Sequence, residues 1–537
     1  MKTRTNRLLS LLLCAVLLTA CLPLTLAADA AQTPVIVVSG MGSFPMYDGE
    51  IDPDNQVWAP QAKTILNVVG KSLWPLAKAA LRRDLNVFAD ESFPLAYEAI
   101  FDAVACDETG TPLHELTTPK FPQSVDHYQK ELLDAEETED EIGIIKGLAS
   151  RVGAEHVYFF NYDFRLSPYI HAADLNAYIA AVKAEQHASK VTLVPCSMGG
   201  IVVNTYLSVY GSGDIDRIIY TMVASKGIDL VGELFNQNFS VDLSVLTERL
   251  FNFEEGKLFS QAMLSLLKTV TDITPGLRQV VNRLAARLLS ALSDRVFKDI
   301  IAKSLVTMPG MWAFVPDAYY ASAKQTLFPD GMNETFRKTI DDYHYNVQNQ
   351  AEALMQAAKD SGVQMYVLAA YGYVGFPMTD KAYEQSDCLI ETKNESFGAT
   401  VARYGETLGR DYRMAGTVCS DPAHHHVSTD NIVDASTCLF PEQTWFLKYN
   451  RHVGIPCDTD AAALMAYLAT SETQTTVHAD SRFPQFVHLN LITGKFASLT
   501  GETVKESLFD KESNTLIRTL KLIRDFFDWL KNKLNIQ

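Results

Sequence analysis

The sequence lacks several features that would assign the chain to other classes of protein. Beyond the N-terminal region, no segment is both long enough and free enough of charge to span a membrane. Neither a phosphate-binding loop nor a dinucleotide-binding fingerprint occurs, and no internal repeat or low-complexity linker interrupts the 537 residues. Basic residues are outnumbered, with 46 Lys and Arg against 64 Asp and Glu, so the acidic balance disfavours nucleic acid as a partner. The hydrophobic content of 47% is sufficient for a sizeable core.

The N-terminus has the pattern of a secretory signal peptide. Three basic residues precede an apolar run that begins at Leu8, and small residues follow at 27–30. We therefore predict that residues 1–28 are removed and that the protein is secreted. The tetrapeptide Leu-Thr-Ala-Cys that ends at Cys21 also resembles a bacterial lipobox, which would make Cys21 a lipid anchor at the cell surface. Because the apolar run continues beyond this cysteine, cleavage near Ala28 is favoured.

The most informative segment is an apolar strand at 191–194 that runs into Cys-Ser-Met-Gly-Gly at 196–200 and then into a helix. This is the context of a nucleophile elbow, in which a serine lies on a tight strand-to-helix turn near backbone N–H groups. Pro195 replaces the first glycine of the usual G-x-S-x-G pattern. The plainer interpretation is a serine in an ordinary turn. Cys196 is expected to be a buried thiol, and a cysteine nucleophile is less favoured because Ser197 holds the exposed corner.

Further segments support the elbow and follow one another in a meaningful order. The strand 34–38 opens into a glycine-containing loop, which is where a hydrolase sheet supplies the second oxyanion donor. The expected donors are the N–H groups of Met41 and Met198. Downstream lie an acid, Asp430, and a histidine, His452, so that serine, aspartate and histidine occur in the order that α/β-hydrolases use.

At these positions the chain resembles the lecithin:cholesterol acyltransferase and lysosomal phospholipase family. The matching segments are Ser-Gly-Met at 39–41, Tyr-Asp-Phe-Arg-Leu at 162–166 (Tyr-Asp-Trp-Arg in the family), the elbow, the strand 366–372, Thr-Asp-Asn-Ile-Val at 429–433 (Gly-Asp-Gly-Thr-Val in the family) and His452. The resemblance implies an enzyme that cleaves or transfers acyl esters of lipids, with Asp430 as the acid of its triad. The nearby Asp434 is expected to cap a short helix instead.

Alternating strand and helix signals predict an α/β-hydrolase fold with a mostly parallel central sheet. The expected strands and helices lie near 35–38, 156–160, 172–185, 191–194, 201–209, 215–223 and 364–370. A single domain at 29–505 is interrupted by insertions at about 44–150 and 230–355. The first corresponds to where the resembled family carries a membrane-contacting subdomain. The second has helical spacing from Leu258 to Leu292 and is expected to form a cap, which either packs on the core or also lines an acyl-chain pocket as a moving lid.

The last segment, 506–537, is predicted to form a cationic amphipathic helix. Its apolar stripe consists of Leu516, Leu520, Ile523, Phe527, Leu530 and Leu534. Such a helix either docks on the acidic surface of its own protein, which we favour, or lies in a membrane interface.

Cysteines and histidines cluster around the expected acid and base. Four cysteines, from Cys388 to Cys457, could form disulfides there in an oxidising compartment, with the pairing left open. Three consecutive histidines at 424–426 lie near Asp421, but consecutive side chains diverge and no second ligand group stands at a recognised spacing. We therefore expect neither a metal nor a cofactor.

Together these patterns predict a secreted serine hydrolase that forms an acyl-enzyme. Ser197 attacks the ester carbonyl, His452 transfers the proton, and Asp430 orients the imidazole. Water as acceptor gives a lipase, phospholipase or esterase, whereas a bound alcohol gives an acyltransferase. The expected partner is a lipid or another acyl ester, and membrane contact is the alternative role of the C-terminal helix. The alternative is a catalytically inactive hydrolase fold that binds lipid or another surface.

Overall fold

Five ranges of the chain are described by the computed structural model: 32–135, 141–238, 292–376, 379–489 and 496–499. Several predicted features lie outside them, namely the signal segment 1–28 with Cys21, the helical positions from Leu258 to Leu289 and the C-terminal helix 506–537. Among the helices inside these ranges, none is long and apolar enough to cross a membrane.

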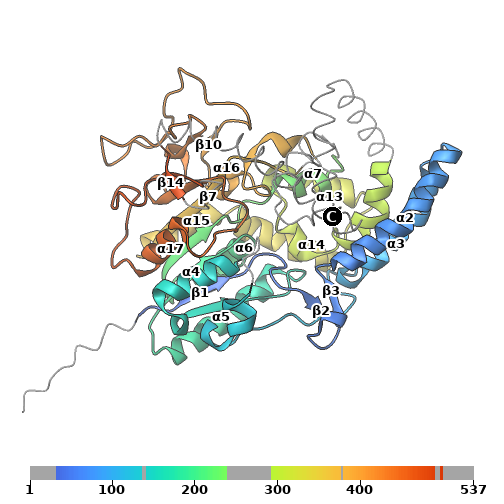
Figure 1. Cartoon of the computed structure of the whole chain (residues 1–537), viewed down its shortest axis with the longest axis horizontal. Helices are drawn as coiled ribbons and strands as arrows, with labels where there is room; N and C mark the ends of the chain where they lie inside the picture. The colour runs from blue at the N-terminus through green and yellow to red at the C-terminus, as the bar shows by residue number, and fades with distance from the viewer. Residues whose placement is uncertain (1–31, 136–140, 239–291, 377–378, 490–495, 500–537) are drawn as a thin grey trace, which may run out of the picture.

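An eight-stranded sheet runs through the body of the protein (Figure 1). Its order is β14-β13-β12-β7-β6-β5-β1-β4, and all neighbouring strands are parallel except β13 and β14. The strands are β1 (Val35–Val38), β4 (Val157–Phe160), β5 (Val191–Pro195), β6 (Ile215–Thr221), β7 (Gln364–Tyr371), β12 (Thr444–Lys448), β13 (Phe486–Leu489) and β14 (Phe496–Ser498). The predicted α/β fold with a mostly parallel sheet is therefore confirmed, and the five predicted strands are β1, β4, β5, β6 and β7.

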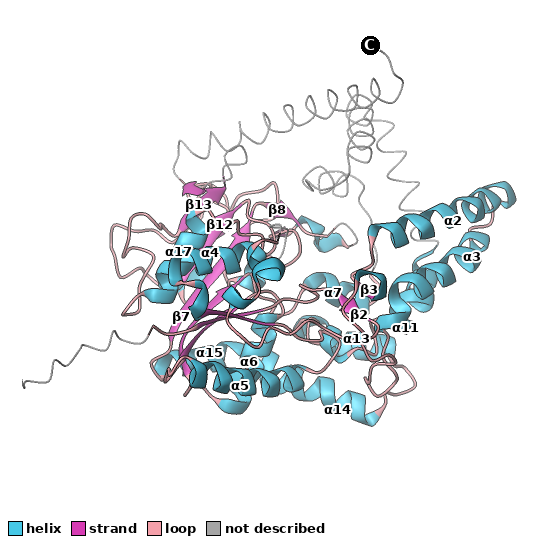
Figure 2. Cartoon of the chain, turned by 60° about the horizontal axis from the view of Figure 1, so that its bottom comes forward, coloured by secondary structure: helices cyan, strands magenta, loops and turns pink. Residues whose placement is uncertain are grey.

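Both faces of the sheet are covered, which explains why its strands are continuous apolar runs. In β1, Ile36 and Val38 join one hydrophobic cluster, while Val35 and Val37 join a second cluster on the opposite face. Figure 2 shows the helices on the two sides of the sheet. The first cluster includes side chains of α5 (Pro168–Glu185), α6 (Gly199–Tyr210) and α15 (Ala351–Asp360), and the second includes side chains of α4 (Ile142–Val152) and α17 (Asp460–Thr470).

Part of the first insertion, over residues 62–96, projects from this body. The insertion contains the small hairpin β2 (Met46–Tyr47) and β3 (Gln56–Trp58), followed by α2 (Ala62–Arg82) and α3 (Asn86–Ala96). Helices α2 and α3 lie side by side and extend away from the sheet (Figure 1). Helix α2 packs chiefly against α3, and several large apolar side chains of this helix stay exposed.

The described part of the second insertion packs on the core. Its helices are α7 (Asp229–Phe235), α11 (Ala302–Ser304), α12 (Pro309–Trp312), α13 (Asp317–Leu327) and α14 (Glu334–Tyr343). Trp312 is 1% exposed, and its ring lies 5.2 Å from that of Phe235 and 5.6 Å from that of Tyr320. Packing therefore explains these described aromatic residues without a second role.

A long excursion separates β7 from β12. It begins with β8 (Tyr373–Val374), which pairs with β9 (Gln385–Ser386), and continues through α16 (Thr392–Glu395). Strand β10 (Thr400–Val401) then pairs with β11 (Val433–Asp434). Helix α16 lies close to the carboxyl end of β7, where Thr392 and Glu395 bind the backbone of Ala370.

Candidate active site

Ser197 lies in a sharp turn between β5 and α6. Its φ is +50°, in the left-handed region that a residue other than glycine rarely adopts, as expected for a strained nucleophile elbow. The turn passes so close to β1 that a Cβ atom on Gly199 would lie 2.4 Å from the carbonyl oxygen of Val38. A Cβ on Gly200 would likewise lie 2.6 Å from Val223 Cβ. The two glycines are therefore required by the close approach of neighbouring strands.

His452 follows β12 and faces the elbow. Its Nε2 lies 2.8 Å from Ser197 Oγ, which is hydrogen-bond distance. Its backbone N–H donates to the carbonyl oxygen of Asp387 at 2.8 Å, and the N–H of Val453 donates to Met222 Sδ at 3.1 Å. The backbone on both sides of the ring is thus anchored, and the structure brings together the predicted serine and histidine.

The carboxylate that contacts His452 belongs to Asp387, directly after β9. Its Oδ2 is hydrogen-bonded to His452 Nδ1, while Oδ1 accepts the N–H groups of Leu389 and Ile390 at 2.8 Å each. Asp387 is fully buried. Burial alone raises the pKa of a carboxyl group, but the contacts with His452 and Glu395 outweigh it, so the pKa of Asp387 is lowered.

Asp430 does not lie against His452, and the predicted placement of this residue is wrong. Its Oδ2 binds Lys448 Nζ at 2.8 Å and the hydroxyl of Tyr371 at 3.2 Å, and its Oδ1 accepts from Ser428 Oγ at 2.6 Å. The side chains of Asp430 and Lys448 are each 5% exposed. A buried ammonium group requires a carboxylate partner, so Asp430 is held at the end of β12 by this ion pair.

Asp434 has the role predicted for it. Its Oδ1 accepts the N–H of Ser436 at 2.9 Å, at the start of a short helical turn over Ala435–Thr437. Its Oδ2 accepts from the hydroxyl of Tyr412 and from the N–H of Ala415. Asp434 is therefore a capping residue, as expected.

A second buried carboxyl group, Glu395, lies behind Asp387. Burial and the charge of Asp387 raise the pKa of Glu395 well above its usual value. Ala370 N–H donates to Glu395 Oε2 at 2.7 Å, which fixes the carboxyl group on β7. The pKa values of the two neighbouring carboxyl groups are therefore shifted in opposite directions, that of Asp387 downward and that of Glu395 upward.

Among the described residues, both predicted oxyanion donors have backbone N–H groups that donate no hydrogen bond. Met198 directly precedes α6, and Met41 lies in the loop after β1. Both groups therefore remain candidates for binding an oxyanion. The adjacent Gly40 N–H donates to Glu141 Oε1 at 2.6 Å, and a Cβ on Gly40 would lie 3.0 Å from both Glu141 Oε1 and Ser197 Cβ.

Glu141 is buried, with 3% of its surface exposed. It ends the acidic run 134–141, and a run of this kind is usually a solvated helix face or loop. A buried carboxyl group therefore lies beside the nucleophile.

The other motif residues have supporting roles. The hydroxyl of Tyr162 donates to the carbonyl oxygen of Ser39 at 2.8 Å, and Arg165 makes a two-point ion pair with Asp163. Cys196 is a free thiol with no exposed surface, and burial raises its pKa well above the usual value. A neutral buried thiol is a poor nucleophile, in agreement with the expected structural role of Cys196.

Comparisons with known proteins add little to this geometry. No family model matches the chain, and no curated protein matches it in sequence. A match in structure exists to "The crystal structure of Tle4-Tli4 complex". That chain is 12% identical, the match covers 63% of the present chain and 75% of the other, and the TM-score is 0.26. A likeness this weak carries no argument about activity, which has to come from the side chains themselves.

Proposed function

We propose that the protein is a serine ester hydrolase or acyltransferase that works through an acyl-enzyme. The observation that carries the proposal is the continuous chain of contacts from Ser197 Oγ through both ring nitrogens of His452 to Asp387. A strained turn holds the serine, and a buried carboxylate fixes the ring.

In the proposed reaction, Ser197 Oγ attacks the ester carbonyl carbon while its proton passes to His452 Nε2. The tetrahedral intermediate collapses as the carbon–oxygen bond to the leaving alcohol breaks, and that alcohol receives the proton from Nε2. Water or a second alcohol then attacks the acyl-enzyme, again with His452 as the base. Asp387 remains ionised, accepts the Nδ1–H and stabilises the imidazolium form.

Exposed apolar residues on α2 support a lipid as the substrate. Large apolar side chains recur on this helix at helical spacing, with exposed fractions of 53% for Val69, 62% for Leu73 and 65% for Trp74. Exposed apolar groups gathered on one projecting element are typical of contact with a membrane or another apolar surface. We propose that α2 contacts the lipid aggregate.

Export of the protein also remains a proposal. It rests on the signal pattern at 1–28, with anchoring through Cys21 as the alternative. A secreted enzyme would meet lipid substrates outside the cell.

One observation favours the alternative of an inactive hydrolase fold. The Glu141 carboxyl group accepts a hydrogen bond from the N–H of Gly40, beside the nucleophile. Negative charge at this position would oppose a developing oxyanion. A fold of this kind would bind lipid without cleaving it. Turnover of a simple ester distinguishes the two functions.

The test is hydrolysis of a short soluble ester by Ser197→Ala and by the matched control Cys196→Ala. We expect the serine variant to lose roughly 10⁴-fold or more in kcat, since removing the nucleophile of a triad has that effect. The neighbouring cysteine variant should stay within tenfold of wild type because its thiol is buried in the core. Absence of turnover in the folded wild type would favour the inactive alternative.

A further inference from the structure

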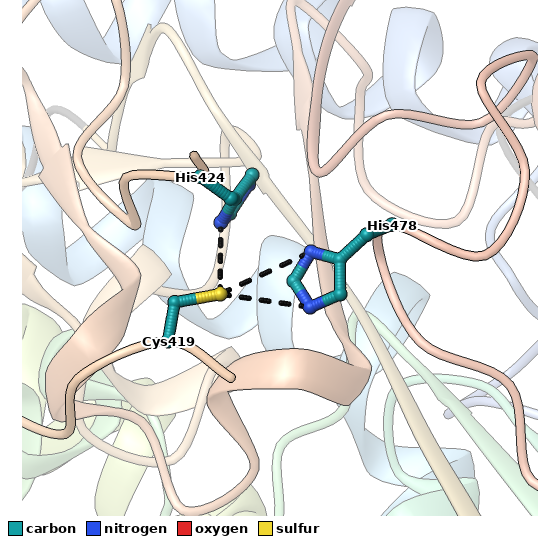
Figure 3. A group of neighbouring side chains, drawn as sticks. All are labelled: Cys419, His424 and His478. Atoms are coloured by element: carbon teal, nitrogen blue, oxygen red, sulfur yellow. Dashed lines mark hydrogen bonds between the residues drawn. The ribbon is translucent and has the colours of Figure 1, made fainter. Parts of the chain in front are cut away.

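A second cluster of reactive side chains lies near the start of strands β12 and β13. Figure 3 shows Cys419 between His424 and His478, which come from two loops that are distant in sequence. His426 and Glu442 complete the surroundings, and their ligand atoms lie within 4.8 Å of Cys419 Sγ and of each other. Thiol and imidazole groups are ligands that transition metals prefer.

The distances within the cluster fit a tetrahedral metal site. Cys419 Sγ lies 3.4 Å from His424 Nδ1 and 3.6 Å from His478 Nε2. Zinc bonds of about 2.3 Å to sulfur and about 2.0–2.1 Å to nitrogen, at a tetrahedral angle, place these two ligand atoms about 3.6 Å apart. The two sulfur–nitrogen distances therefore match two edges of a zinc tetrahedron, and the ligand atoms of the three side chains all lie within 4.8 Å of one another.

His426 provides an independent indication of a ligand. It has no exposed surface, and among the described residues its Nε2 has no hydrogen-bond partner. Its Nδ1 lies 2.8 Å from Gln485 Oε1. The amide nitrogen of Gln485 donates to the carbonyl oxygens of Pro441 and Thr444, which fixes its oxygen toward the imidazole. His426 must then carry its proton on Nδ1, and Nε2 is left with an unused lone pair.

This arrangement is the one found around metal-binding histidines. A ligand histidine usually donates its other ring N–H to a carbonyl or carboxylate oxygen, which fixes its tautomer and orientation. Glu442 is occupied differently, because its Oε1 accepts the N–H of Ser420 at 2.7 Å and its Oε2 lies 3.9 Å from His478 Nε2. His426 is therefore the better fourth ligand, and Glu442 lies beside the site.

We propose that Cys419, His424, His426 and His478 bind a Zn²⁺ ion in a closed, four-coordinate site. The site departs from the expectation of no metal, because the second ligand group for the histidine run comes from residues that are distant in sequence. Four protein ligands leave no position for a substrate, so the metal has a structural role. Glu442 lies in the short helical turn Pro441–Gln443 that precedes β12, and Gln485 directly precedes β13, whereas His452 follows the opposite end of β12. The ion thus connects the long excursion between β7 and β12 to the ends of β12 and β13 that lie away from Ser197.

The test uses the full-length protein with a purification tag that contains no histidine. We expect elemental analysis to give about one zinc per chain, and the zinc-stripped protein reloaded with Co²⁺ to show the thiolate charge-transfer band and the intense visible bands of tetrahedral cobalt. Cys419→Ser should abolish the charge-transfer band and weaken zinc binding more than about 100-fold, because loss of a ligand exceeds the effect of losing an outer partner.

The matched control is His425→Ala, which removes the exposed central histidine of the same run. This variant should keep the cobalt spectrum and the zinc affinity of wild type. Equal loss in His425→Ala and Cys419→Ser would overturn the proposal, as would a wild-type protein that binds neither ion at micromolar concentration. The wild-type spectrum decides the matter even if a variant fails to fold, and no readout depends on ester turnover.

Discussion

At the residue scale, the central result is which carboxylate lies against His452. The candidates differ in their partners, since Asp387 binds the imidazole whereas Asp430 binds the buried ammonium group of Lys448. A carboxylate already paired with a buried lysine contributes to stability, and one paired with a histidine beside a serine contributes to chemistry.

Asn substitutions of the two aspartates should therefore have opposite effects. Asp387→Asn should keep the fold but present an amide to Nδ1 and favour the wrong tautomer, which costs on the order of 10⁴ in kcat. Asp430→Asn should stay within tenfold of wild-type kcat but lose about 3 kcal/mol of unfolding free energy, because Lys448 is left buried without its charge partner. Ester assays and urea unfolding measure the two quantities. If Asp430→Asn were inactive and Asp387→Asn active, Asp430 would be the acid of the triad, as predicted from the sequence.

At the scale of elements, the loop that carries Asp387 is tied to α7 by a second set of buried charges. Glu391 Oε2 accepts the N–H of Asp229 at 3.0 Å, and Lys393 Nζ lies 2.9 Å from Asp229 Oδ2. Burial and the charge of Asp229 raise the pKa of Glu391 to about 8. The protonated form of this carboxyl group is the one that the fold stabilises.

The consequence is a dependence of stability on pH. A carboxyl group whose pKa is raised by folding contributes stability below its unfolded pKa of about 4.3, and this contribution is lost as the pH rises through about 8. Glu391→Gln keeps an acceptor for Asp229 N–H but cannot ionise. We therefore expect the melting temperature of the variant to rise relative to that of wild type as the pH increases from 5 to 8. Parallel melting curves across this range would contradict the raised pKa.

The exposed face of α2 gives a prediction about substrate form. Replacing both Leu73 and Trp74 by Ser should lower turnover on lipid vesicles by about tenfold or more, because burying even one such side chain in an apolar phase contributes at least about 1.5 kcal/mol. Turnover of a short soluble ester should not change. Lys71→Ser, also exposed on α2, is the matched control. Equal losses on both substrates would show that α2 serves folding rather than lipid contact.

The burial pattern of each element explains how well the sequence predicted it. Strands such as β1 and β5 are uniform apolar runs with both faces covered, so their position was predictable. Strand β12 begins with Thr444 and ends with Lys448, whose charge is neutralised only by the distant Asp430, and it was not predicted. The elbow was predictable because its glycines are required locally. The acid was not, because only the pairing of β8 with β9 carries Asp387 to His452.

At the scale of the whole molecule, the sheet determines where chemistry occurs. Ser197 follows β5, His452 follows β12, and Asp387 lies in the excursion after β7, so the three residues meet at the carboxyl ends of parallel strands. This is where open α/β sheets place their ligands. The Cys419 cluster lies near the opposite ends of β12 and β13, which separates the proposed metal from the proposed catalytic residues.

The most direct test of the central claim is to map the covalent adduct of a fluorophosphonate probe by mass spectrometry of the digested full-length protein. The account predicts one adduct per chain, on Ser197, which forms far more slowly in Asp387→Asn and at a near wild-type rate in Asp430→Asn. An adduct on any other residue, or no adduct on the folded wild-type protein, would contradict the proposal that Ser197 is a nucleophile activated by His452 and Asp387.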